Sequence, residues 1–161
     1  MKKETERKIM DNRQKEYFQQ AYDTAAELVL KATDEFTEMF PNSASVNHFY
    51  QPVKMTDWTE GFWTGEVWLA FEKTGDEKLK RTAEIEIEKF NQRIKERIVV
   101  DHHDMGFLYS PSCVAAYKLT GNEVAKEAAL LAADNLLGRF HEKGQFFQAW
   151  GELGAEDNYR L

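Results

Sequence analysis

Three short segments of the sequence combine aromatic side chains with carboxylates, and these residue types together suit the binding of a sugar. The segments are residues 57–63 (DWTEGFW), 102–109 (HHDMGFLY) and 146–152 (FFQAWGE). A sugar ring presents C–H faces that lie flat against tryptophan, while its hydroxyls donate hydrogen bonds to short carboxylates. We therefore predict that the three segments are loops that converge on one carbohydrate-binding site.

The four tryptophans fall into two groups. Trp58 and Trp150 lie in the expected loops, and we predict that they line the site, with a place in the core as the alternative. Trp63 and Trp68 enter or lie on an apolar segment, where a large aromatic residue is more often part of the core.

His102-His103-Asp104 has residue types that bind metals, but adjacent histidines point in different directions and no third ligand follows at a known spacing. We interpret the histidines as residues that pack in the loop or orient Asp104. Cys113 is the one cysteine and is interpreted as a small residue inside a helix. No glycine-rich phosphate loop is present. The sequence therefore predicts no metal and no cofactor.

Composition argues against two kinds of partner. With 21 basic and 28 acidic residues the formal charge is −7, and no basic stretch alternates with aromatic residues, which argues against nucleic acid. The longest apolar runs, 67–71 and 128–133, are far shorter than the roughly 20 residues needed to cross a bilayer. Residues 1–8 carry charges with no apolar segment behind them, so a cytoplasmic chain without a secretory signal is expected.

The spacing of apolar residues predicts helices of two kinds. Three long segments repeat apolar residues every three or four positions, which is typical of helices with one side in water; these are expected near 12–40, 77–98 and 123–141. Two shorter segments, near 62–74 and 110–119, are apolar or small nearly all round and are expected to be surrounded by protein. Ser110-Pro111 is predicted to start the second of these, because serine caps helices and proline is tolerated in the first turn.

One part of the sequence repeats. Residues 69–77 (LAFEKTGDE) align with residues 115–123 (AAYKLTGNE) at an offset of 46. In each copy glycine can end one helix in the left-handed conformation, and the following Asp or Asn can cap the next helix. Residues 60–62 align with 105–107 at an offset of 45, so we expect a one-residue difference in the loop. The sequence thus predicts one helix hairpin used twice.

Hairpin repeats bury their inner faces by stacking on neighbours. Residues 148–152 resemble the start of a third copy, but the inner helix that should follow is missing. Two hairpins and a lone first helix cannot close a ring. We therefore expect the rest of the assembly to lie in the same or another chain.

Taken in order, the loops resemble the N-terminal part of unsaturated glucuronyl hydrolases, glycoside hydrolase family 88. The resemblance runs from about Met55 to the chain end and rests on four stretches: 58–66 (WTEGFWTGE), 74–76 (TGD), 103–109 (HDMGFLY) and 148–150 (QAW). Members of this family are (α/α)6 toroids of six hairpins. The resemblance implies an all-α chain of consecutive antiparallel helix hairpins, with residues 1–161 as the N-terminal part of a single toroid catalytic domain.

The resemblance also implies a reaction. The family removes 4,5-unsaturated glucuronic acid from the non-reducing end of lyase-generated, glycosaminoglycan-type oligosaccharides. It hydrates the C4=C5 vinyl ether, after which the sugar opens and the glycosidic bond breaks, unlike the two-carboxylate displacement of most glycosidases. Asp104 matches the first catalytic-site aspartate, and Trp58 and Trp150 match aromatic residues of the subsite for the unsaturated ring. The second aspartate, the proton donor, is implied beyond Leu161, so the segment alone is expected to be inactive.

Two other interpretations stay open. A related toroid, such as an unsaturated rhamnogalacturonyl hydrolase or a sugar epimerase, would share the hairpins and differ in its loop residues. A non-catalytic scaffold of helical repeats would have a similar period, about 40–47 residues in HEAT-like arrays. Its loops should be short and polar, whereas these are long and aromatic.

Overall fold

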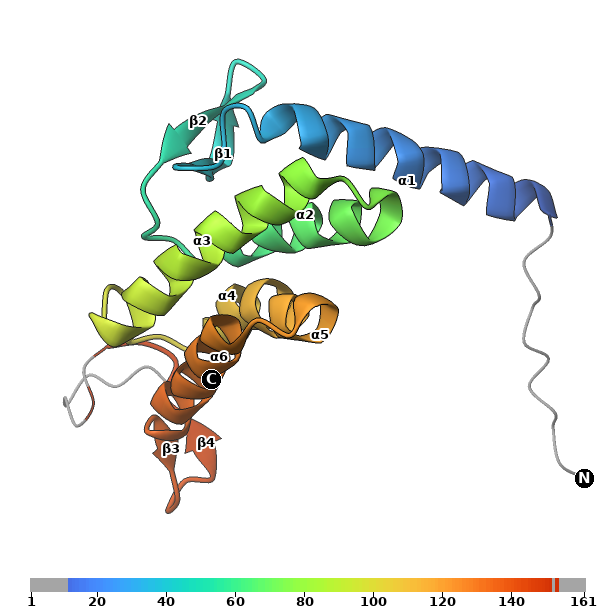
Figure 1. The fold of residues 1–161 in the computed structure, drawn as a ribbon. Coiled ribbons are helices and arrows are strands. Elements are labelled where there is room, and N and C mark those ends of the chain that lie inside the picture. The colour runs from blue at the N-terminus through green and yellow to red at the C-terminus, as the bar shows by residue number, and fades with distance from the viewer. Residues whose placement is uncertain (1–11, 152, 154–161) are drawn as a thin grey trace, which may run out of the picture.

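The computed structural model describes residues 12–151 and residue 153, and its helices form stacked hairpins (Figure 1). In chain order the elements are α1 (Asn12–Ala32), β1 (Phe40–Val46), β2 (Phe49–Val53), α2 (Glu60–Thr74), α3 (Glu77–Lys95), α4 (Met105–Tyr109), the π-helix η1 (Ser110–Val114), α5 (Ala115–Thr120), α6 (Glu123–Leu137), β3 (Phe140–His141) and β4 (Phe146–Phe147). The segments α4, η1 and α5 follow one another without a break and act as one inner helix. The predicted class of consecutive helix hairpins is confirmed, with two small antiparallel β-hairpins added, β1–β2 and β3–β4.

The two helix hairpins turn at the corners that the repeat predicts. Gly75 ends α2 with φ 70°, and Gly121 ends α5 with φ 72°, both in the left-handed region that favours glycine. The carboxylate of Asp76 then accepts a hydrogen bond from the Lys78 N–H (2.8 Å), and the Asn122 side chain accepts one from the Ala125 N–H (2.9 Å). Both caps start the outer helix of a hairpin, α3 or α6.

The start predicted for the second inner helix is wrong. This helix begins at Met105, five residues before Ser110, and Ser110 and Pro111 lie in its π-helical turn. Proline has no N–H to donate, so the regular hydrogen-bond ladder is interrupted there and the turn widens. The helix from 105 to 120 is one residue longer than α2 from 60 to 74. The extra residue of the second repeat is therefore absorbed inside the helix and not, as expected, in the loop.

The first helix is also shorter than predicted, because α1 ends at Ala32 and not near residue 40. Side chains compete for the backbone carbonyls at this point: the Thr33 hydroxyl donates to the Leu30 carbonyl and the Thr37 hydroxyl to the Thr33 carbonyl, both at 2.7 Å. The turn that follows brings Phe36 into the core, where its ring meets that of Trp63 at a centroid distance of 5.6 Å. The apolar spacing thus continues past the end of the helix because these side chains still reach the core.

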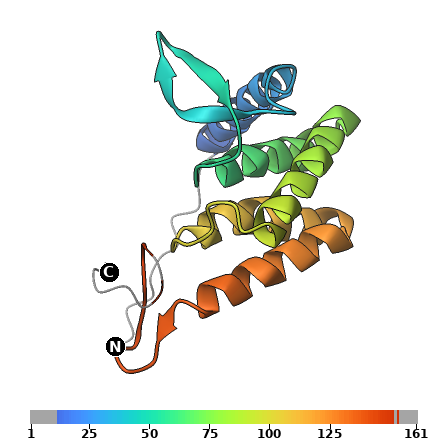
Figure 2. The ribbon, with the colours of Figure 1, turned by 90° about the vertical axis from the view of Figure 1, so that its left-hand side faces the viewer.

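The inner helices approach each other closely along a groove made by two glycines of α2. A Cβ added to Gly61 would lie 2.2 Å from the Phe107 carbonyl oxygen, and one added to Gly65 would lie 2.7 Å from Cβ of Pro111. The inner helices therefore pack almost backbone to backbone, and Figure 2 shows the two hairpins stacked in layers. This packing brings the loops before α2 and α4 together.

No helix in the part of the chain that the structure describes has the length and apolar character needed to span a membrane.

Candidate functional site

Asp104 lies at the start of α4 and is buried, with 7% of its surface exposed. Its backbone carbonyl accepts the N–H groups of Phe107 (2.9 Å) and Leu108 (3.2 Å), but its side chain makes no capping hydrogen bond with the helix. The carboxylate instead faces two histidines: Oδ1 lies 3.4 Å from His103 Nε2, and Oδ2 lies 3.7 Å from His102 Nδ1. The helix start does not use this carboxylate, which leaves it available for chemistry.

His102 holds the backbone of Asp104 in place. Its Nδ1 accepts the Asp104 N–H (3.2 Å), so the ring proton belongs on Nε2, which donates to the Val99 carbonyl (3.0 Å). Burial lowers the pKa of His102, which favours this neutral form. Since both ring nitrogens are engaged, His102 orients Asp104, which is one of the two roles that the sequence left open.

Trp150 packs against both histidines. Its ring stacks on His102 at a centroid distance of 5.8 Å and an angle of 22°, and His103 meets it edge-on at 4.9 Å. The His103 N–H also donates to the Ala149 carbonyl (2.9 Å), which joins the third loop to the second. Trp150 remains 44% exposed. It therefore offers an aromatic surface beside Asp104.

Trp58 belongs to a second aromatic group, which it forms with Phe62 and Phe107. The ring centroids of these three residues lie 5.5–5.8 Å apart, and all three side chains are at least 40% exposed. The Trp58 N–H donates to the Asp57 carboxylate (2.7 Å), which fixes the loop locally. The group is a hydrophobic platform on the rim of the inner helices.

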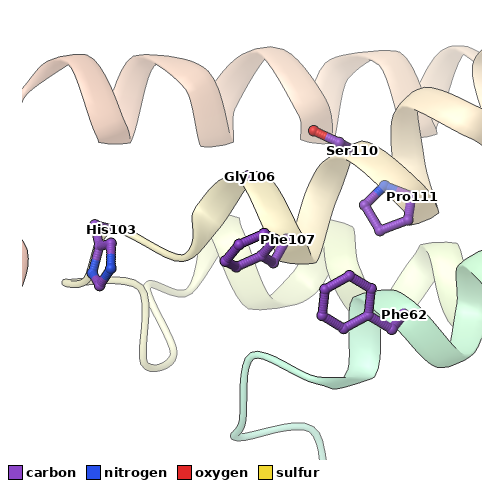
Figure 3. Close-up of a pocket in the computed structure, with 6 residues that line it drawn as sticks. All are labelled: Phe62, His103, Gly106, Phe107, Ser110 and Pro111. Atoms are coloured by element: carbon purple, nitrogen blue, oxygen red, sulfur yellow. The ribbon is translucent and has the colours of Figure 1, made fainter.

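An open hollow connects the two aromatic groups. It is lined by Phe62, His103, Gly106, Phe107, Ser110 and Pro111. Figure 3 shows Phe62 and Phe107 next to each other, with His103 at one end of the hollow and Pro111 at the other. Phe62 and Phe107 line the hollow and join it to Trp58, whereas Asp104 and Trp150 do not line it and are joined to it by their contacts with His103. A sugar in this hollow could lie against the aromatic faces of Phe62 and Phe107, next to the imidazole of His103.

Several residues singled out by type lie in the core. Trp63 and Trp68 are 7% and 1% exposed, as expected, and the Trp63 Nε1–H donates to the Glu86 carboxyl group (2.7 Å). Cys113 is fully buried, and burial raises the pKa of its thiol to about 12, which makes it a poor nucleophile. Within the described residues, no group of three His, Cys, Asp or Glu side chains could hold a metal ion.

Glu60 is not a sugar ligand, although it is the acid next to the aromatic residues in the first loop. It is 1% exposed, and its Oε1 accepts the N–H groups of Thr56 (2.9 Å) and Asp57 (2.7 Å). Its other oxygen lies 3.4 Å from the guanidinium of Arg93. Burial raises the pKa of Glu60, and these hydrogen bonds and the arginine oppose that rise.

Sequence reasoning missed the buried arginines behind the loops, Arg93 and Arg139, which are 2% and 1% exposed. Their spacing in the sequence could have indicated a shared role, because the two arginines are 46 residues apart and this is the offset of the repeat.

No family model matches the sequence. The chain is 51% identical to an unsaturated chondroitin disaccharide hydrolase of Streptococcus agalactiae over 128 aligned residues. The aligned residues make up 80% of this chain and 32% of that protein. A crystal structure of an unsaturated glucuronyl hydrolase of Bacillus sp. GL1, responsible for the degradation of glycosaminoglycan, is 37% identical with a TM-score of 0.82, over 88% of this chain and 37% of that one. A mutant of unsaturated glucuronyl hydrolase from Streptococcus agalactiae, complexed with dGlcA-GalNAc6S, is 45% identical with a TM-score of 0.69, over 74% of this chain and 33% of that one.

By its fold, the chain is part of an (α/α) toroid. Within that class it belongs to the unsaturated glucuronyl hydrolase family, glycoside hydrolase family 88. It spans about a third of the length of the curated relatives that it matches.

Proposed function

We propose that this chain is the N-terminal part of a toroid catalytic domain that removes 4,5-unsaturated glucuronic acid from the non-reducing end of glycosaminoglycan-type oligosaccharides left by lyases. The single observation that carries the proposal is the arrangement at the start of α4, where the Asp104 carboxylate makes no capping hydrogen bond and faces two histidines, one of which, His103, lines the aromatic hollow. The names of the relatives favour a glucuronyl substrate over a rhamnogalacturonyl one.

The reaction adds water across a vinyl ether. A proton is added to C4 and the water oxygen to C5, which gives a hemiketal at C5. The hemiketal opens to a ketone, and the hemiacetal left at C1 then expels the neighbouring sugar. This sequence needs a carboxyl group to donate the proton and activate water, and such a group contributes about 10²–10⁴-fold.

In this proposal Asp104 accepts hydroxyls of the unsaturated sugar and tunes the proton donor, while Trp58 and Trp150 hold the ring. The exposed aromatic faces of both tryptophans support the assignment. The proton donor itself comes from the remaining hairpins, in the same or another chain, so the 161-residue segment alone is inactive.

The test compares the complete toroid domain with the 161-residue segment on an unsaturated chondroitin disaccharide. The complete domain should remove the absorbance of the double bond and release the neighbouring sugar with a new reducing end, and the segment should do neither. A saturated disaccharide of the same composition should be left intact, because it has no vinyl ether. Cleavage of both disaccharides at similar rates would indicate ordinary glycoside hydrolysis and would refute the hydration mechanism.

A further inference from the structure

Two buried arginines, Arg93 in the last turn of α3 and Arg139 just after α6, contact the backbone of the site loops. Arg93 lies in the last turn of α3, and its Nε and Nη2 donate to the carbonyls of Ile98 (3.1 Å) and Val99 (2.9 Å), which precede α4. Its Nη1 donates to the Asp57 carbonyl (2.7 Å) in the loop before α2 and faces the carboxylate of Glu60 (3.4 Å), the first residue of α2. One side chain therefore joins the first loop to the second.

Arg139 makes the same arrangement one repeat later. It follows the end of α6, and its Nε and Nη2 donate to the carbonyls of Gln148 (2.9 Å) and Gly151 (3.0 Å) in the third loop. Its Nη1 is directed to the second loop, 3.9 Å from the Asp101 carboxylate. In both arginines Nε and Nη2 hold the following loop and Nη1 faces the preceding one.

The two arginines differ in how completely Nη1 is satisfied. Met105 is the repeat equivalent of Glu60, so Arg139 has no buried carboxylate to face. Among the described residues, Nη1 of Arg139 has no hydrogen-bond partner. Arg139 thus contacts the third loop through two carbonyls and the second loop through one long ion pair, whereas Arg93 makes hydrogen bonds with both of its loops.

The contacts run from the arginines to the candidate site residues. The Val99 carbonyl that accepts from Arg93 also accepts from His102, whose other nitrogen accepts the Asp104 N–H. Gln148 and Gly151, held by Arg139, flank Trp150 on either side. Neither arginine is exposed to the hollow, so neither can touch a substrate.

We propose that Arg93 and Arg139 form a repeated arginine clamp: they are positioning residues, Arg93 for Asp104 and Trp58, Arg139 for Trp150. The expected effect of the two arginines on turnover rests on the proposed function, but their effect on the loop backbone does not. A guanidinium suits this role because its donors form a rigid planar fork, which reaches several carbonyls at once, whereas an ammonium is a single flexible point charge.

The first test is hydrogen exchange of the backbone in Arg93→Lys and Arg139→Lys, followed by mass spectrometry. Lysine keeps the charge opposite Glu60, which avoids leaving a buried carboxylate unpaired. Arg93→Lys should speed exchange at residues 56–57 and 103–104 by at least about tenfold, and Arg139→Lys should do so at Gln148 and His103. Arg81→Lys, an exposed change on α3, should alter neither region.

The exchange pattern has two outcomes that overturn the clamp. One is faster exchange throughout α2, α3 and α6, which would mean general destabilisation. The other is unchanged exchange in the site loops. Because only Arg139→Lys is expected to change exchange at Gln148, that residue still decides the matter if Arg93→Lys does not fold.

The second test is turnover of an unsaturated disaccharide by the complete domain. Arg93→Lys should lower kcat by at least about tenfold, because it misplaces the Asp104 carboxylate that holds the sugar and tunes the proton donor. Arg139→Lys should raise KM more than it lowers kcat, because Trp150 binds the sugar ring. Wild-type kinetics in both variants would overturn the positioning role. A wild-type domain without turnover would instead refute the proposed function, and the exchange pattern alone would then decide the clamp.

Discussion

Asp104 carries the main prediction at the scale of single residues. In the complete domain, Asp104→Asn keeps the size of the side chain and removes its charge. A hydrogen bond to a charged group contributes about 1.5–3 kcal/mol, and a catalytic role adds to it, so turnover should fall by at least about 100-fold. The melting temperature should change little, because the carboxylate makes no capping bond with α4. Turnover is followed as loss of the absorbance of the double bond.

A matched control for Asp104→Asn is Asp34→Asn, the same chemical change at an exposed position in the turn after α1. Its turnover should equal that of the wild type. If Asp104→Asn also turned over normally, Asp104 would have no part in the chemistry, and the hollow would lose the carboxylate on which its assignment depends.

The sequence could indicate the residues of the candidate site, because Asp104 and Trp150 stand in loops at matching points of a repeat. It could not predict how they are held. Glu60 and Asp104 are both acids beside aromatic residues, yet Glu60 is bound by backbone N–H groups of its own loop and by an arginine from another helix. Such partners depend on where distant backbone segments pass, which residue spacing does not encode.

At the scale of elements, the corners were predictable and the helix ends were not. Glycine and a capping residue determine the turns at Gly75 and Gly121 through local geometry. The end of α1 at Ala32 depends on tertiary packing of the turn that follows, and the π-turn at Pro111 depends on an extra residue that a close-packed inner helix had to absorb. The change of the repeat offset from 45 to 46 indicated that the second copy has one extra residue, but it did not indicate that this residue lies inside the helix.

Glu86 gives a prediction at this scale, since it joins α3 to α2. It is fully buried, its carboxyl group lies 2.7 Å from Trp63 Nε1 and 2.6 Å from the Thr64 hydroxyl, and burial raises its pKa to about 8. Below pH 4.5 both folded and unfolded states are protonated. Between pH 4.5 and 8 only the unfolded state ionises, so the free energy of unfolding should fall as the pH rises and level off above pH 8.

Glu86→Gln should remove this loss, because the amide can accept from Trp63 and donate to Thr64 without titrating. The variant should be more stable than the wild type at pH 7, by an amount on the order of a few kcal/mol. Urea unfolding at pH 5, 7 and 8.5 measures the difference, which should grow with pH. Glu88→Gln, at an exposed position of the same helix, should show no such trend. A destabilised Glu86→Gln at pH 8.5 would show that the wild-type carboxyl is ionised and paired.

At the scale of the whole molecule, the stack is open at both sides. Large apolar side chains are exposed on α1 at one side of the hairpins and on α6 at the other; these are Tyr17, Phe18, Leu28, Leu130 and Leu137. Within α1 as described, Ala26 alone is buried. In a closed ring of hairpins the first and last helices of this segment would each contact a neighbour, so these faces are where the remaining hairpins of the proposed toroid would pack.

The open face of α6 leads to the last prediction, which concerns the 161-residue chain by itself. Leu130 and Leu137 are 58% and 61% exposed and stand seven residues apart, on one face of the helix. Burying a leucine contributes about 1.5–3 kcal/mol, so two exposed leucines favour self-association when no further hairpin covers them. We expect the chain to associate with rising concentration in sedimentation velocity experiments.

Replacing both leucines with lysine should weaken this association by at least about tenfold, because each substitution would place a charge in the apolar contact. Ile85→Lys is the control: Ile85 is 40% exposed on α3, between the two open sides, where a complete ring would leave it in water. This variant should associate as the wild type does. A wild-type chain that stays monomeric at all concentrations, with cooperative unfolding, would mean that α6 needs no neighbour, and the proposal of an incomplete toroid would then be wrong.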